Sequence, residues 1–216
     1  MITIVLPARN EPKLNEFLLK LHEVLEAIPE PYEILICMGD RETLNIPLRP
    51  LPFQRVVKTY GDSVERSILS GLSQARGERI LCLDADGSHP VHLIPEMITI
   101  LQAYEMAVGS RFSDNGENDS TPFRRLVTWG CGALAHLAGS ELTDPMSGFF
   151  AVRRDVLNRC RFRPLAWKTC LEIELRARPT ILEVPIKFTD RKEGHSKTSW
   201  KVGVRIIYQL MGEILK

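Results

Sequence analysis

The sequence predicts an α/β protein with a Rossmann-like, mostly parallel β-sheet that is covered by helices on both faces. Short apolar, β-branched runs alternate with segments of helical periodicity along the first half of the chain. Polar clusters directly follow three of the apolar runs, at residues 7–11, 39–40 and 84–86. In such sheets, ligands bind beyond the carboxyl ends of the strands. The three clusters are therefore expected to meet in one crevice.

The apolar runs and the turn residues between them place the individual elements. Strands are expected at residues 2–7, 32–38, 53–59, 79–84, 105–110, 148–154 and 180–188. Helices are expected from Asn10 to Ile28 and at 63–75, 95–104, 122–138, 155–160 and 199–216. Asn10 is the expected cap of the first helix, with Pro12 in its first turn. Loops are expected at 41–52, at the polar run 113–121, which we predict to be mobile, and at the basic run 191–197.

Composition narrows the class of protein. The chain has 216 residues and is 44% hydrophobic, which suits one large domain. Its formal net charge is +1, so the protein has no overall positive potential that would attract nucleic acid. The five cysteines are odd in number and mostly lie in apolar runs, so we expect buried, reduced thiols in a reducing compartment. Because MITIVLPARNE enters a strand pattern at once, no signal peptide is expected, and no apolar run is long enough to span a bilayer.

Asp84 and Asp86, in the stretch LCLDADGSHP, place two like charges at the end of a buried strand. One interpretation is an Asx turn that only caps the following segment. A second is a pair of hard oxygen ligands that holds a divalent cation on a nucleotide diphosphate. A third is a phosphohydrolase of the haloacid-dehalogenase type, with Asp84 as nucleophile, Asp86 as acid/base and Ser110 on a later strand. The residues alone leave these alternatives open.

Five stretches in order along the chain carry a family resemblance. They are VLPARNE at 5–11, LDADGSHP at 83–90, VGSRF at 108–112, DPMSGFFAVRR at 144–154 and EVPIKFTDRKEGHSK at 183–197. Together they resemble family 2 glycosyltransferases of the dolichol-phosphate (polyprenyl-phosphate) mannosyltransferase type. The resemblance implies a nucleotide-diphospho-sugar transferase (GT-A) fold over residues 1–197 and Mg²⁺ or Mn²⁺ as cofactor. It also implies a nucleotide-sugar donor, GDP-mannose first and a UDP-sugar second, and a polyprenyl-phosphate acceptor.

The resemblance assigns roles to residues that match the family motifs. The implied catalytic residues are Asp86, Arg111, Arg124, Arg191 and Lys197. The implied substrate-binding residues are Pro7, Arg9, Glu11, Asp40, Asp84, Thr128, Asp144 and Ser147. The implied metal ligands are Asp84 and Asp86, with Ser88 as a further ligand.

The residue types also fit the chemistry on physical grounds, because transfer of a sugar from a nucleotide to a lipid phosphate gathers three phosphates. Arginine makes bidentate contacts with phosphate, and lysine supplies a point charge. The acceptor oxygen is already anionic, so no strong general base is required. We therefore expect a single displacement with inversion at the anomeric carbon.

The second strand departs from the family pattern. Met38 and Gly39 stand where the family has an acidic pair, and Asp40 follows as a substitute. Arg9 stands where the first motif usually has an aromatic residue. These differences leave the donor open and give a further alternative, a non-catalytic subunit that binds sugar nucleotides.

Residues 198–216 form a separate C-terminal unit in this interpretation. Trp200, Ile207 and Leu210 fall largely on one helical side, with Lys201 and Arg205 elsewhere. Such a helix could lie on a membrane, as a lipid acceptor would need, or pack on the sheet. We expect a protein peripheral to the cytoplasmic face of a membrane, with a membrane-anchoring subunit as a candidate partner and no nucleic-acid partner.

Overall fold

The computed structural model describes residues 1–8, 11–39, 54–59, 64–114, 116–118, 122–162 and 168–188. For residues 58–59, 117–118 and 122–127 it describes the backbone only. The loops predicted at 41–52 and 191–197 and the helix predicted at 199–216 lie outside the described residues, as does the cap predicted at Asn10.

The centre of the molecule is a seven-stranded sheet with the order β3-β2-β1-β4-β7-β5-β8. Its strands are β1 (Ile2–Pro7), β2 (Tyr32–Gly39), β3 (Gln54–Thr59), β4 (Arg79–Cys82), β5 (Met106–Ser110), β7 (Phe150–Arg153) and β8 (Ile181–Pro185). All pairs are parallel except those of β7, which runs antiparallel to both β4 and β5. The predicted mostly parallel α/β sheet is confirmed.

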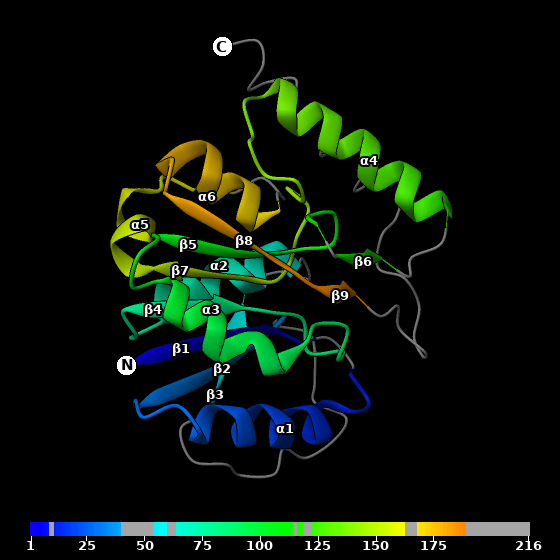
Figure 1. The fold of residues 1–216 in the computed structure, drawn as a ribbon. Coiled ribbons are helices and arrows are strands. Elements are labelled where there is room, and N and C mark those ends of the chain that lie inside the picture. Colours follow the sequence, from blue (N-terminus) through cyan, green and yellow to red (C-terminus); the bar gives the residue numbers. More distant parts are fainter. Residues whose placement is uncertain are drawn as a thin grey trace.

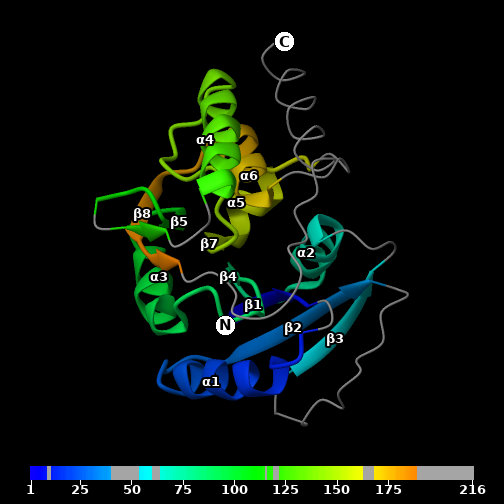
Figure 2. The ribbon, with the colours of Figure 1, turned by 90° about the vertical axis from the view of Figure 1, so that its right-hand side faces the viewer.

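Helices cover both faces of this sheet (Figures 1 and 2). The α-helices are α1 (Leu14–Glu26), α2 (Val64–Gln74), α3 (Ile94–Ile100), α4 (Pro122–Leu137), α5 (Arg154–Arg159) and α6 (Thr169–Ala177), and a short 3₁₀ turn (Val91–Leu93) precedes α3. Buried side chains of α1 and α3 pack on one face of the sheet, and those of α2, α5 and α6 pack on the other. Helix α4 packs on α6 through Cys131, Ala135 and Leu171 rather than on the sheet.

The strand sequences follow from burial on two sides. All residues of β1 and β2 are buried, including those that alternate between the two faces. A strand that is covered on both faces reads as a continuous apolar run, as ITIVLP does, because neither face meets water. The same pattern allowed these strands to be located from the sequence.

Four elements differ from the prediction. Helix α1 begins at Leu14, later than the predicted start at Asn10, with Lys13 as its N-cap and no side-chain cap bond. The run 180–188 is two strands, since β9 (Lys187–Phe188) leaves the main sheet to pair with β6 (Glu117–Asn118). The polar run 113–121 therefore contains a strand, and helix α6 was not predicted.

In the described part of the chain, none of the helices combines the length and the apolar character needed to cross a bilayer.

Candidate functional site

Strand β7 brings a middle segment of the chain to the carboxyl edge of the sheet. Because it runs against its neighbours, it begins where β4 and β5 end, and Phe150 is in register with both Cys82 and Val108. The segments that follow β4 and β5 carry Asp84 and Arg111, and the segment that precedes β7 carries Phe149. Three pieces of sequence that are far apart therefore meet at one edge.

The turn after β4 holds the paired aspartates. The Ser88 N–H and hydroxyl both donate to Asp86 Oδ1, over 2.9 and 2.6 Å. Gly87 has a φ of +77°, a left-handed conformation that suits glycine. The predicted Asx-type turn is thus present. It also orients Asp86, and it places the predicted ligand Ser88 against that carboxylate.

His89, the residue that follows this turn, forms a hydrogen bond with the first residue of the turn. Its Nδ1 accepts a hydrogen bond of 3.1 Å from the backbone N–H of Asp84, and only 6% of its surface is exposed. Burial lowers the pKa of His89; Asp84 and Asp86 act to raise it, and the charges of Arg111 and Lys168 lower it. Acidic and basic groups therefore act in opposite directions on the pKa of the same ring. The acids of the turn and Arg111 belong to the same neighbourhood.

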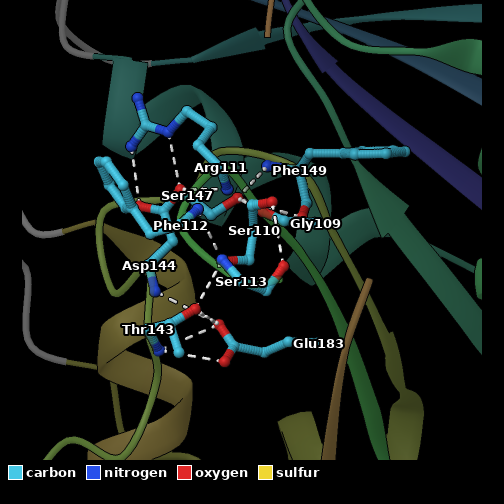
Figure 3. A network of polar contacts seen from close by, with 10 residues as sticks. All are labelled: Gly109, Ser110, Arg111, Phe112, Ser113, Thr143, Asp144, Ser147, Phe149 and Glu183. Atoms are coloured by element: carbon cyan, nitrogen blue, oxygen red, sulfur yellow. Dashed lines mark hydrogen bonds and ion pairs between the residues drawn. The ribbon is translucent and has the colours of Figure 1, made fainter. Parts of the chain in front are cut away.

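Arg111 is held by Asp144. The Arg111 Nε donates to Asp144 Oδ2 over 2.7 Å and Nη2 donates to Oδ1 over 2.8 Å, as Figure 3 shows. The guanidinium carbon lies 5.4 Å from the ring centroids of both Phe112 and Phe188. Such a fork-to-carboxylate contact fixes the plane of the guanidinium. In the described residues, Nη1 has no protein acceptor and can meet a ligand.

Glu183 of β8 supports the loop that carries Asp144. Its carboxylate accepts hydrogen bonds from the N–H and hydroxyl of Thr143 and, over 3.3 Å, from the N–H of Asp144 (Figure 3). The Ser110 and Thr143 hydroxyls are 2.6 Å apart, and the Ser110 oxygen also accepts the Ser113 N–H. These bonds engage the Ser110 hydroxyl, whereas the phosphohydrolase alternative requires this hydroxyl to contact a phosphate ligand.

Ser147 joins the same loop to β5. Its hydroxyl donates to the Gly109 carbonyl over 2.7 Å and accepts the Phe149 N–H over 3.2 Å. A Cβ on Gly109 would lie 2.7 Å from the Phe149 ring, so this position has no room for a side chain. The predicted binding residue Ser147 thus has protein partners at its hydroxyl.

The remaining predicted residues are placed in part. Pro7 ends β1 and Glu11 lies just before α1, whereas Thr128 is half-buried on α4. Arg9, Asp40, Arg191 and Lys197 lie outside the described residues, and Arg124 is described by its backbone alone.

Sequence reasoning missed three residues near the site. Glu183 and Lys168 carried no motif signal of their own, since one lies within an expected strand and the other before an unpredicted helix. The spacing of His89 and His92, three positions apart, by itself favours a core or surface histidine over a metal pair. The structure agrees on the burial of His89, with His92 exposed, but gives His89 a specific partner.

The chemistry of the turn fits a divalent cation shared with a phosphate ligand. Among the described residues, no three His, Cys, Asp or Glu side chains gather as a self-contained metal site. Asp84 and Asp86 offer hard carboxylate oxygens, and a Cβ on Gly148 would lie 3.5 Å from Asp84 Oδ2, so glycine keeps the space beside that oxygen open. Mg²⁺ is commonly held by one or two carboxylates together with substrate phosphates.

The curated relatives of this chain include dolichol-phosphate mannosyltransferases. That of Pyrococcus furiosus is 29% identical over 231 residues, covering 99% of this chain and 65% of the relative. That of Saccharomyces cerevisiae is 30% identical over 169 residues, covering 72% of this chain and 62% of the relative. The chain thus spans slightly less than two thirds of the length of either relative.

Solved structures share the architecture. The mannosyl-3-phosphoglycerate synthase of Rubrobacter xylanophilus matches with a TM-score of 0.67 at 18% identity, over 97% of this chain and 72% of that chain. The glucosyl-3-phosphoglycerate synthase of Mycobacterium tuberculosis matches with a TM-score of 0.64 at 17% identity, over 99% of this chain and 80% of that chain. These likenesses confirm the GT-A fold.

A sequence pattern described as "Glycosyl transferase family 2" matches residues 3–161, a span that includes the paired aspartates, Arg111 and Asp144. This match covers most of the chain and leaves the phosphohydrolase alternative without support. The resemblance found in the sequence motifs is confirmed, and the chain belongs to glycosyl transferase family 2.

Proposed function

We propose that this protein is a metal-dependent, inverting glycosyltransferase that moves a hexose, in the first instance mannose from GDP-mannose, onto a polyprenyl phosphate. The observation that carries the proposal is that the Asp84–Asp86 turn, through His89, and the Asp144-bound Arg111 both contact the ring of Phe188. Relatives named dolichol-phosphate mannosyltransferase support the choice of donor sugar and acceptor.

The proposed donor end of the site consists of acids that face a diphosphate through a cation. Asp84 and Asp86 would hold Mg²⁺ or Mn²⁺, with Ser88 as a further oxygen. When bound, the ion neutralises charge that builds on the leaving diphosphate. A structural neighbour solved with Mn²⁺ and UDP-glucose makes Mn²⁺ the first ion to test.

The proposed acceptor end consists of cations. Arg111, oriented by Asp144, would present Nη1 to a phosphate, and Arg124 with Thr128 on α4 would bind the lipid phosphate.

Two further cations are assigned to the donor: Arg191 and Lys197 would close over its diphosphate. The acceptor oxygen carries its own negative charge, so positioning and electrostatic stabilisation supply the catalysis without a general base. The bond to the sugar forms as the bond to the diphosphate breaks, which inverts the anomeric centre.

The nucleoside would lie over the ends of β1 and β2. Pro7, Arg9, Glu11, Asp40 and the buried Met38 belong to this end of the sheet by sequence position. Met38, which stands where the family has an acid, is 1% exposed and packs in the hydrophobic core, so this position supplies no carboxylate to the nucleoside. The base preference therefore has to be tested with both guanine and uracil nucleotides.

The working location follows from the acceptor. A polyprenyl phosphate sits in a bilayer, so we place the protein at a membrane surface, on the cytoplasmic side. Residues 198–216 are the candidate contact, and a membrane-anchoring subunit is a candidate partner.

Titration calorimetry with GDP, UDP, GDP-mannose and UDP-glucose, each with and without Mn²⁺, tests the donor side. Binding that requires Mn²⁺ supports the proposal, and failure with all four ligands overturns it. Transfer of labelled sugar to a short-chain polyprenyl phosphate tests the acceptor side. Metal-dependent binding without any transfer would instead favour the non-catalytic binding subunit.

A further inference from the structure

We propose that His89 is a positioning residue for the metal motif, and that it acts by holding the peptide of Asp84 so that the two carboxylates keep their relative placement. The inference rests on the proposed function for what the carboxylates bind. That His89 restrains the Asp84 peptide is argued from the contacts of His89 in the structure. The similar proteins described above assign no role to this residue.

The first contact fixes which nitrogen of the ring accepts. The backbone N–H of Asp84 can only donate, and it lies 3.1 Å from His89 Nδ1. Nδ1 must therefore present its lone pair, which places the proton of the neutral ring on Nε2. The bond joins the first residue of the turn to the residue after its end.

The remaining contacts fix the ring. It stacks on Phe149, with centroids 5.3 Å apart and planes 17° apart, and it meets the edge of Phe188 at 5.9 Å. A Cβ on Gly148 would lie 3.6 Å from His89 Cε1, in ordinary van der Waals contact, so Gly148 also neighbours the ring. With 6% of its surface exposed, the ring has little freedom to leave this position.

Two sets of hydrogen bonds stabilise the turn. The Asp84 N–H donates to His89 across residues 84–89, and within this stretch Ser88 donates twice to Asp86 Oδ1. Phe188 also lies 5.4 Å from the Arg111 guanidinium, so the ring that buttresses His89 packs against the phosphate-binding cation as well. Loosening His89 should therefore disturb both carboxylates while leaving their chemical identity unchanged.

Two substitutions separate the acceptor from the ring. His89→Phe keeps an aromatic ring against Phe149 but removes the acceptor. His89→Asn removes the ring but keeps an oxygen near the place of Nδ1. Loss of a group that orients metal ligands weakens metal binding by roughly 10- to 100-fold, and we expect His89→Phe to weaken Mn²⁺-dependent GDP binding to this extent. His89→Asn should retain most of that affinity although it unfolds at a lower temperature. His92→Phe, at the exposed neighbour, is the matched control and should change neither quantity.

Amide hydrogen exchange of Asp84, followed by NMR without metal or nucleotide, reads the hold independently of function. Exchange should be slow in the wild type and in His89→Asn, and fast in His89→Phe. Equal protection in His89→Phe, or wild-type GDP affinity in that variant, overturns the proposal. So does a folded His89→Asn that binds GDP as weakly as His89→Phe. Absence of nucleotide binding in the wild type overturns the proposed function and the metal role, while the exchange result still decides whether His89 holds the turn.

Discussion

Arg111 and Asp144 form a bidentate ion pair in which the carboxylate is fully buried, with the shorter of the two side-chain bonds at 2.7 Å. A third bond, from the Arg111 N–H to Asp144 Oδ2 over 3.2 Å, adds the backbone to the same carboxylate. The arginine that the resemblance assigns to catalysis is thus pre-oriented by a residue that it assigns to substrate binding.

Replacement of Asp144 by alanine should destabilise the fold. Removal of one partner from a buried pair leaves an uncompensated charge, which typically costs about 3–5 kcal/mol. Urea denaturation of Asp144→Ala measures the loss. Asp155→Ala, which removes an exposed i,i+4 partner of Arg159, is the control and should cost about 0.5 kcal/mol or less. Equal stability of the two variants would show that the pair contributes nothing to folding.

Replacement of Asp86 by alanine should abolish metal-dependent nucleotide binding while the fold survives. Its side chain is half-buried in a turn and does not belong to the hydrophobic core, so circular dichroism and the unfolding temperature should change little. Calorimetry with GDP and Mn²⁺ should show a loss of at least about 10-fold. Ser88→Ala should cause a smaller loss, because it removes the further oxygen and the 2.6 Å bond that orients Asp86 but leaves both carboxylates in place. Unchanged affinity in Asp86→Ala would contradict the assigned role.

Replacement of Arg124 by alanine should impair acceptor use and spare the donor. A charge-assisted contact to phosphate contributes about 1.5–3 kcal/mol, so kcat/KM for the polyprenyl phosphate should fall by roughly 10- to 100-fold. The dissociation constant for GDP-mannose should stay the same. Arg125→Ala, one residue further round the helix, is the matched control. Equal losses for donor and acceptor would refute this division of roles.

The stability of the protein should fall as the pH rises above 9. Burial raises the pKa of Cys37 to about 12 and that of Cys160 also to about 12, from an ordinary value of 9.0. Between these values the folded state binds more protons than the unfolded chain, so each thiol favours unfolding as pH increases. At pH 10 the loss is about 1–2 kcal/mol per thiol.

Denaturation of the wild type and of Cys37→Ala at pH 8 and pH 10 isolates this effect. Other groups titrate in the same range, so the quantity to compare is the difference between the two proteins. The variant should lose less stability between the two pH values than the wild type does. An identical loss would mean that the Cys37 thiolate forms as readily in the folded protein as in the unfolded one.

Elements with a clear hydrophobic pattern, either a continuous apolar run or helical spacing of apolar residues, were predictable from the sequence. Elements without such a pattern were not. Strands β1 and β2 are continuous apolar runs, and α1 has buried residues at helical spacing. Helix α6 was missed because residues Thr169 to Glu174 are all buried, so its first turns show no alternation between an apolar and a polar side. Strand β9 was merged with β8 because the apolar run continues past Pro185; that proline, which has no N–H to donate, is the one local sign of the change of partner at Ile186.

The site was predictable in its chemistry but not in its contacts. The paired aspartates and Arg111 stand out as charged residues at the ends of apolar runs. Their partners do not, because a contact between residues 33 positions apart depends on how β5 and β7 are ordered in the sheet. His89 shows the same limit, since its role depends on the approach of Gly148 and Phe149 from another strand.

The ion pair between Arg111 and Asp144 also joins the two ends of the long segment that contains β6 and α4. The described elements between these ends lie outside the main sheet, where β6 pairs with β9 and α4 packs on α6. Under the proposed function this segment carries the acceptor contacts, so it can be exchanged as a unit while the ends of β1, β2 and β4, where the donor is proposed to bind, stay the same. A chimaera that carries the corresponding segment of a relative should therefore keep the nucleotide preference of this chain and take on the lipid preference of that relative.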